Sequence, residues 1–291
     1  MTLVLLRTLR ALALALSPAW ARRVGIALGR FGHAVVPYRR GMIRRAMARS
    51  LGGAPTDPEI RRLTRLNYEH YGQLALEILR LKRVVDGDLS AIRIEGRENL
   101  DAALSKGRGV LALTAHLGNY DQLAVAVQAL GYQVSIISKK PKSEAVERFW
   151  MDERRAAGLR IFTRDDSPIG MIRVLKANGI LGVILDQHAH IASVTVDFFG
   201  RPAQTMKSLA VLAGRSGAPV VPMFSERLAD GRHVIRALPE VDLVADGTSD
   251  EAVQANTQRF TAIIEEAIRA RPEQWTWIHR RWKAADRTPL D

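Results

Sequence analysis

From about Ile92 onward, short apolar runs alternate with amphipathic stretches, and this alternation constrains the fold more than any other feature of the 291-residue sequence. The runs that predict strands are 110–113, 134–138, 180–185, 220–224 and 234–238. The stretches that predict helices are 121–130, 144–157, 208–215 and 249–269. Strands alternating with helices form a mainly parallel sheet covered on both faces. We therefore expect a three-layer α/β/α domain over residues 91–291.

The first 90 residues have a different pattern, that of arginine-rich helices. Thr56-Asp57-Pro58-Glu59 is a helix start signal, and apolar residues at helical spacing then continue to about Lys82. Up to Arg65 the chain carries thirteen arginines, no lysine and two carboxylates, so most of its net charge of +13 lies here. A basic, leucine-rich region suits an anionic membrane surface. We predict that residues 1–90 form a basic helical membrane-docking region.

The first helix of this region has an amphipathic pattern. Leucines at 5, 9, 12 and 16 would share one face, with Arg7 and Arg10 opposite, which is typical of a helix lying in the membrane interface. No uncharged stretch reaches the roughly 20 apolar residues that cross a bilayer. Two alternatives remain open. Ala19-Trp20-Ala21 resembles a signal-peptide cleavage site, and an amphipathic helix can also pack on the protein's own core.

Composition narrows the possible function classes. The apolar fraction of 47% argues against disorder. The chain has no cysteine, which excludes a disulfide framework, a thiolate nucleophile and a cysteine-based zinc site. Nucleic acid is the other acidic partner that a basic chain can bind. We do not expect it here, because the arginines are interleaved with aliphatic residues and no reading motif is present.

The strongest candidate for chemistry follows the strand predicted at 110–113. In open parallel sheets, ligand sites lie at the carboxyl ends of the strands. The segment after this strand contains His116 and Asp121, which on one regular helix would point about 140° apart. A chain break at Gly118-Asn119 would let the carboxylate reach the imidazole. A histidine oriented by an acid can deprotonate a hydroxyl. The alternative is a structural histidine, with Asp121 favoured in the first turn of a helix.

Several ordered sequence blocks resemble a known family. They are GRGVLALTAHLGNYD at 107–121, DQ followed by VDFFGRPA at 186–203, GAPVVPMF at 217–224 and EQWTWIHRRWK at 273–283. RRGMIRRAMARSL and NYEHYGQLALEILRL look like the opening region of the same family. In order from about Arg39 to Lys283, the chain resembles the lipid A biosynthesis (late) acyltransferases. These are the lauroyl and myristoyl transferases of Gram-negative bacteria, within the glycerolipid acyltransferase superfamily.

The resemblance implies a glycerol-3-phosphate acyltransferase-like fold and transfer of a fatty acyl group to a hydroxyl of a lipid A precursor or related membrane glycolipid. The donor would be acyl carrier protein or acyl-CoA, at the cytoplasmic face of the inner membrane, without cofactor or metal. His116 would be the general base and Asp121 its paired acid, in HX4D spacing; many lipid A enzymes carry Glu at the second position. The positions expected to bind substrate are Arg154, Arg164, Asp186, Gly118 and Asn119.

Other functions remain as alternatives. The acceptor could be another lipid, such as a lysophospholipid or a phosphatidylinositol mannoside. Asp186, His188 and His190 alternate as D-x-H-x-H, which on a strand would place three metal-binding side chains on one face. We do not favour a metal, because Asp186 belongs to the DQ block and a His-x-His after a strand is often solvated. The chain lacks the G-x-S-x-G elbow of serine hydrolases. A non-enzymatic basic module that binds membrane or nucleic acid is the alternative of a different class.

Overall fold

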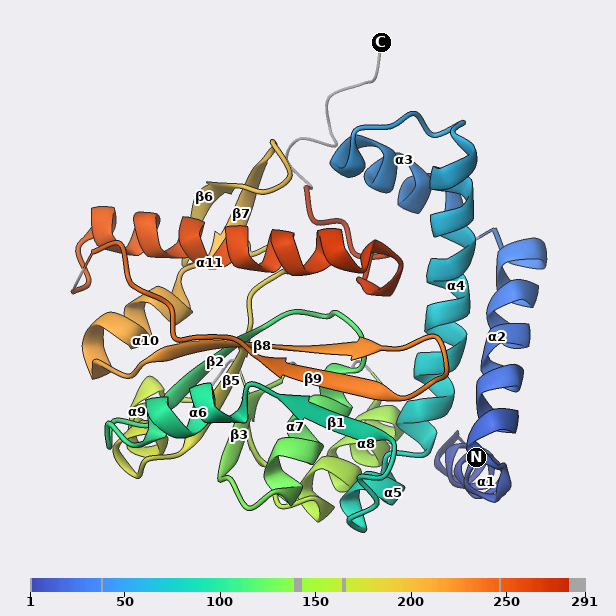
Figure 1. Ribbon diagram of the computed structural model, residues 1–291, viewed down its shortest axis with the longest axis horizontal. Helices are drawn as coiled ribbons and strands as arrows, with labels where there is room; N and C mark the ends of the chain where they lie inside the picture. Colours follow the sequence, from blue (N-terminus) through green and yellow to red (C-terminus); the bar gives the residue numbers. More distant parts are fainter. Residues whose placement is uncertain (1, 38, 139–142, 164–165, 246, 283–291) are drawn as a thin grey trace.

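A computed structural model describes residues 2–37, 39–138, 143–163, 166–245 and 247–282. Its centre is a seven-stranded sheet in the order β1-β9-β8-β2-β5-β3-β4 (Figure 1). The strands of this sheet are β1 (Ile92–Glu95), β2 (Val110–Thr114), β3 (Val134–Ile137), β4 (Arg160–Phe162), β5 (Ile180–Ile184), β8 (Val220–Arg227) and β9 (His233–Ala237). A separate antiparallel pair consists of β6 (Ser193–Asp197) and β7 (Pro202–Met206).

The sheet is mainly parallel, as the sequence predicted. Strands β8, β2, β5, β3 and β4 all run in one direction. At the other edge, β9 pairs antiparallel with β8 through a tight connection, and β1 runs parallel to β9. The carboxyl ends of β2 and β5 therefore lie side by side in the middle of the sheet, which is where α/β folds of this kind form their sites.

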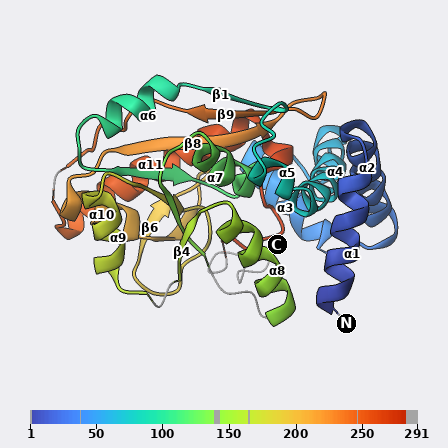
Figure 2. The same cartoon turned by 90° about the horizontal axis from the view of Figure 1, so that it is seen from below.

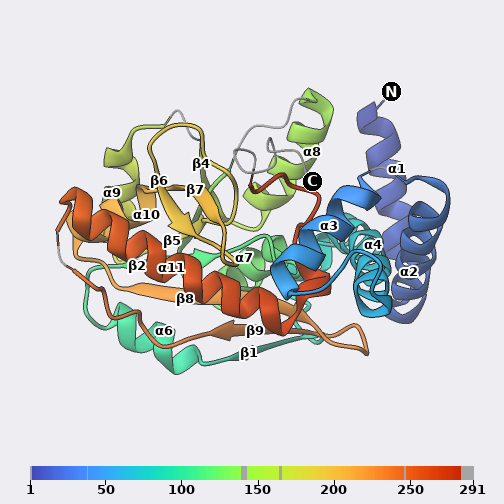
Figure 3. The same ribbon diagram turned by 90° about the horizontal axis from the view of Figure 1, so that it is seen from above.

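Alternate residues of β2 enter two separate cores, which makes the fold three-layered. Leu111 and Leu113 pack with α9 (Pro168–Lys176), α10 (Ser208–Ser216) and α11 (Asp250–Ala270). Val110 and Ala112 pack with α5 (Lys82–Val85), α6 (Arg97–Leu104) and α7 (Tyr120–Ala129). All of these β2 residues are buried, as expected for a central strand covered on both faces. Figure 3 shows α11 lying along the sheet.

The N-terminal helices stand at one end of the sheet. They are α1 (Thr2–Ala15), α2 (Pro18–Val35), α3 (Arg40–Leu51) and α4 (Pro58–Leu79). Residues of α3 and α4, among them Ile43 and Leu63, belong to the same core as the α9–α11 layer. In Figure 2, α1 lies beside α8 (Glu144–Ala156), and Arg10 forms an ion pair with Glu153 between these two helices. None of the helices in the described ranges is both long enough and apolar enough to cross a membrane.

The strands and helices predicted after residue 92 are confirmed, each within a few residues of its predicted bounds. Ser249 caps α11, because its hydroxyl accepts from the Ala252 N–H over 3.1 Å. Asp57 stands at the N-cap of α4, but its carboxylate accepts from Ala54 N–H instead of the helix. Four strands were not predicted from the sequence, namely β1, β4, β6 and β7. β1 and β4 are the edge strands of the main sheet, β6 and β7 form the separate pair, and few residues of these four strands are buried.

Glycines allow α2 to lie directly on α4. A Cβ added at Gly29 would come within 2.3 Å of the Tyr68 carbonyl oxygen, whereas one at Gly32 would meet only a Tyr68 ring carbon at 3.7 Å. Both glycines lie on α2, so they have similar helix propensity. The close approach of the two helix backbones therefore depends on Gly29 and not on Gly32.

We predict that Gly29→Ala destabilises the protein by about 1–3 kcal/mol, because the backbones must separate. The matched change Gly32→Ala should stabilise it by up to about 1 kcal/mol through helix propensity. The midpoint of thermal or urea unfolding measures both effects. Equal effects of the two substitutions would show that α2 and α4 are not packed backbone to backbone.

Candidate active site

His116 and Asp186 meet at one edge of the central sheet. His116 follows β2 and Asp186 follows β5, and these neighbouring parallel strands end at the same edge. Asp186 Oδ1 lies 2.8 Å from His116 Nδ1, and the His116 backbone N–H donates to Asp186 Oδ2 over 2.8 Å. The sheet topology thus places a carboxylate directly against the imidazole that the sequence singled out.

The Asp186 carboxylate is buried and has one further donor. Trp275 Nε1 donates to Asp186 Oδ2 over 2.7 Å. Burial raises the pKa of this carboxyl group, but the His116 charge and the hydrogen bonds lower it more, so the net shift is downward from the usual value. Asp186 is therefore ionised at neutral pH and acts as a hydrogen-bond acceptor for the imidazole.

The partners of His116 determine which ring nitrogen can react. Burial lowers the pKa of His116, whereas the Asp186 carboxylate raises it more, and the Asp121 charge adds a smaller rise; the net shift is upward from 6.5. Because Nδ1–H donates to Asp186, the neutral ring carries its lone pair on Nε2. A partly buried imidazole held in this tautomer by a carboxylate is suited to take a proton from a hydroxyl.

The carboxylate that accepts from the His116 ring is that of Asp186, and the predicted contact of the Asp121 carboxylate with the imidazole is not formed. Asp121 Oδ1 accepts from Arg154 Nε over 2.8 Å and from Arg154 Nη2 over 2.6 Å, and Oδ2 accepts from Trp150 Nε1 over 3.0 Å. The reason is local: α7 begins at Tyr120, so Asp121 lies in its first turn and turns toward α8. The Tyr120 ring instead packs edge-on against His116, with centroids 4.8 Å apart.

Arg154, expected to bind substrate, is engaged within the protein. Besides Asp121, it donates from Nη1 to Ser138 Oγ over 2.9 Å, and its guanidinium lies over the Trp150 ring, 5.0 Å from the centroid. This buried ion pair ties α7 to α8 next to His116. Arg164, the other candidate arginine, lies outside the described residues.

Gly118 and Asn119, also expected near substrate, make contacts that shape the chain after His116. Gly118 has φ +60°, and a Cβ there would fall 2.0 Å from the Ser225 carbonyl oxygen, so a side chain is excluded. Asn119 is fully buried and caps α7 by accepting from Gln122 N–H over 2.9 Å. Its amide donates to Glu77 Oε2 over 3.0 Å. These contacts turn the backbone from β2 into α7, as the predicted break required.

The C-terminal block, residues 273–282, also contacts the chain that follows β2. The His116 carbonyl accepts from Thr276 N–H and from Thr276 Oγ1, over 3.2 and 2.9 Å. Trp275 pairs with Leu117 in an isolated bridge and packs among Phe198, Phe199, Trp277 and Trp282. Trp275, Trp277 and Trp282 are buried core residues. The sequence carried no signal that Trp275 also donates to the acid beside His116.

The alternation of Asp186, His188 and His190 does not assemble a metal site. Asp186 is bound by His116 and Trp275, and the His188 and His190 rings lie edge to face with centroids 4.6 Å apart. Within the part of the chain that the structure describes, no group of three or more His, Cys, Asp or Glu residues could hold a metal ion.

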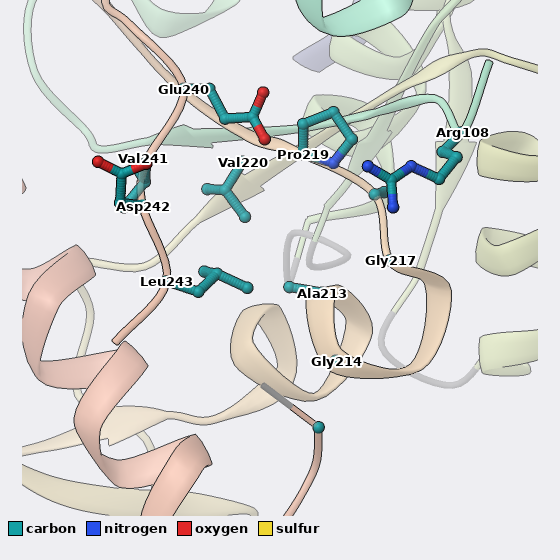
Figure 4. A pocket seen from close by; sticks show the side chains of 12 residues that line it. Arg108, Ala213, Gly214, Gly217, Pro219, Val220, Glu240, Val241, Asp242 and Leu243 are labelled. Atoms are coloured by element: carbon teal, nitrogen blue, oxygen red, sulfur yellow. The ribbon is translucent and has the colours of Figure 1, made fainter. Parts of the chain in front are cut away.

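Two of the cavities among the described residues are well defined, and neither of these two is lined by His116 or Asp186. The larger, of about 480 Å³, is lined by Arg108, Glu240 and Asp242 among others and lies at the start of β8, opposite the carboxyl end where His116 follows β2 (Figure 4). The other, of about 430 Å³, lies between α1, α5 and α8 and is lined in part by Arg7 and Arg10. The catalytic candidates therefore stand apart from both cavities.

The chain is similar to known bacterial acyltransferases. A family model described as bacterial lipid A biosynthesis acyltransferase matches residues 2–284. The phosphatidylinositol mannoside acyltransferase of Mycobacterium tuberculosis is 27% identical over 254 residues, covering 83% of this chain and 77% of the relative. The lipid A biosynthesis lauroyltransferase of Escherichia coli is 27% identical over 194 residues, covering 65% and 60%. A lipid A biosynthesis acyltransferase of Haemophilus influenzae is 25% identical over 186 residues, covering 63% and 56%.

These relatives share one reaction class, and the family model spans nearly the whole chain. The resemblance of the sequence blocks is thereby confirmed, and the alternative of a non-enzymatic basic module is overturned. The chain belongs to the bacterial lipid A biosynthesis acyltransferase family and is an acyltransferase.

Proposed function

We propose that this enzyme transfers a fatty acyl group from a thioester donor to a hydroxyl of a membrane glycolipid, with His116 as general base. The observation that carries the proposal is the hydrogen bond of 2.8 Å between His116 Nδ1 and Asp186, which leaves Nε2 to take the proton. Only about a fifth of the His116 side chain is exposed, so the reacting hydroxyl would approach it in a site that is largely shielded from water.

The reaction requires one proton to move to His116 and back. The acceptor oxygen attacks the thioester carbonyl carbon while its proton passes to Nε2, and the carbonyl electron pair moves onto oxygen. The tetrahedral intermediate then collapses, the carbon–sulfur bond breaks, and the thiolate takes the proton from Nε2. Asp186 stabilises the imidazolium between these two events. The neighbouring Asp121–Arg154 pair fixes α7 and α8 around the site.

The relatives suggest two glycolipid acceptors. Several are named for lipid A biosynthesis, and three for phosphatidylinositol mannoside acylation. A lipid A precursor remains our first candidate, because the family model carries that description. A phosphatidylinositol mannoside is the second, because those relatives align over 83% of the chain and the lipid A enzymes over 63–65%. Acyl carrier protein, which is acidic, and acyl-CoA are the proposed donors, because the basic residues of the N-terminal region suit either of these negatively charged molecules.

Acyl transfer by the purified protein tests the proposal. Wild-type enzyme should acylate at least one of these two glycolipids from palmitoyl-CoA or palmitoyl-acyl carrier protein, as followed by mass spectrometry. His116→Ala should reduce turnover about 10²–10⁴-fold while the protein stays folded. Asp186→Asn should also reduce it strongly, and the double variant should lose little more, because residues acting as a unit fail together. The surface change Asp230→Asn is the matched control.

Two results would contradict the mechanism. One is near-normal transfer by folded His116→Ala protein. The other is a double variant whose loss in activation free energy equals the sum of the two single losses, because this would show that the residues act independently.

We also propose that α1 and α2 dock the enzyme on the cytoplasmic face of the inner membrane. On α1, Leu5, Leu9 and Leu12 are 57%, 41% and 61% exposed, and Trp20, Leu28 and Phe31 are also exposed on α2. Arg10 lies on the other side of α1 and pairs with Glu153 of the α/β domain. The apolar face of α1 thus points outward while Arg10 turns toward the α/β domain, the reverse of a helix packed on its own core. Such an apolar surface is typical of a lipid-binding site.

Replacing Leu5, Leu9 and Leu12 together by Gln should weaken binding to phosphatidylglycerol vesicles, because each leucine gains about 1.5–3 kcal/mol on full burial in lipid. Added salt should weaken the remaining binding by screening the arginines. Co-sedimentation with the vesicles measures both effects. Ile169→Gln with Ile191→Gln is the matched control, since both isoleucines are exposed away from α1 and α2. Equal binding of the triple variant and the wild type would rule out docking through α1.

A further inference from the structure

The side-chain amide of Gln187 lies over the His116 ring. Its Nε2 atom is 3.3 Å from His116 Nε2 and 3.5 Å from His116 Nδ1. Because these two distances are nearly equal, the amide nitrogen stands over the face of the ring and not in line with the Nε2 lone pair, which points outward in the ring plane. The lone pair is therefore left for the acceptor hydroxyl, with the Gln187 amide beside it.

Hydrogen bonds fix the backbone on both sides of Gln187. Asp186 precedes it and is held by His116 and Trp275. His188 follows it, donates its N–H to His279 Nε2 over 3.1 Å, and pairs with Thr205 in a bridge. The Gln187 amide is thus presented beside His116 from a fixed backbone position, and a donor in place before the reaction stabilises a developing charge without reorganisation.

Acceptor binding brings the reacting groups next to this amide. The acceptor hydroxyl must point its proton along the Nε2 lone pair, which the amide does not block. The attacking oxygen then stands within a hydrogen bond of Nε2, and the thioester carbonyl stands in contact with the attacking oxygen. An amide nitrogen 3.3 Å from Nε2 is within reach of that carbonyl oxygen.

We propose that Gln187 is a catalytic residue that donates an N–H to the thioester carbonyl oxygen as the oxyanion forms. The proposal rests on the assignment of His116 as general base. The amide forms this hydrogen bond when the carbonyl electron pair moves onto oxygen, and releases it when the carbon–sulfur bond breaks. The amide gains and loses no proton in either step. Because the donor is neutral, it stabilises the oxyanion without opposing protonation of the adjacent imidazole.

Kinetics of three variants test this role, with palmitoyl-CoA as donor and the glycolipid that the wild type acylates. Gln187→Ala removes the donor and should lower kcat by on the order of 10²-fold, with little change in the KM for the acceptor, because the lost interaction grows only in the transition state. Gln187→Glu places a carboxylate beside the oxyanion and should lower kcat further. Gln254→Ala removes an exposed amide on α11 and should leave kcat unchanged.

The pH dependence of kcat distinguishes two roles of Gln187, donation to the oxyanion and mere orientation of the His116 imidazole. An oxyanion donor leaves the apparent pKa of His116 in the pH–rate profile of Gln187→Ala close to that of the wild type. A shift of this pKa without a fall in limiting kcat would overturn the proposal, as would wild-type kcat in folded Gln187→Ala. If His116→Ala is inactive in the same assay while Gln187→Ala retains wild-type kcat, the general base stands and only the donor role fails. If His116→Ala is also active, both assignments fail.

Discussion

The buried carboxylate of Asp186 is the contact on which the site depends. It accepts from the His116 ring, from the His116 backbone and from the Trp275 indole, and so joins the ends of β2 and β5 to the C-terminal block. A buried carboxylate without such donors would be costly to ionise, and here the donors lower its pKa despite burial. The same hydrogen bonds that stabilise the charge also fix the imidazole tautomer. The interactions that stabilise the buried Asp186 carboxylate are therefore the same ones that prepare His116 for its proposed reaction.

A second buried network supports the turn after His116. Glu77 of α4 pairs with Arg227 of β8, with a distance of 2.7 Å between Oε2 and Nη2, and also accepts from the Asn119 amide. Burial raises the pKa of Glu77, but Arg227 and His233 outweigh it and hold this pKa well below the usual range. Asn119 in turn caps α7, which carries Asp121. Through these contacts α4 also positions the segment that follows His116.

Much of the fold could be predicted from the sequence, because its signals are local. The alternation of apolar runs and amphipathic stretches gave the central strands and the layers, and His116 stood out as a histidine at the end of a buried strand. The partner of His116 could not be predicted in this way. Its identity depends on strand order: β5 lies beside β2, although β3 and β4 come between them in the chain. Asp121 is near in sequence, but the start of α7 at Tyr120 turns it toward Arg154. The donor Trp275, 89 residues from Asp186, left no local signal at all.

The central claim is that Asp186, and not Asp121, which is nearer in the sequence, orients the His116 imidazole that we propose as the general base. An NMR titration of the His116 ring carbons measures this directly. The account predicts that the wild-type pKa lies above 6.5 and that Asp186→Asn brings it below 6.5, because burial then acts without the neighbouring charge. Asp121→Asn should lower it only slightly, because that carboxylate acts on His116 through its charge alone. A larger fall in Asp121→Asn than in Asp186→Asn would contradict the account.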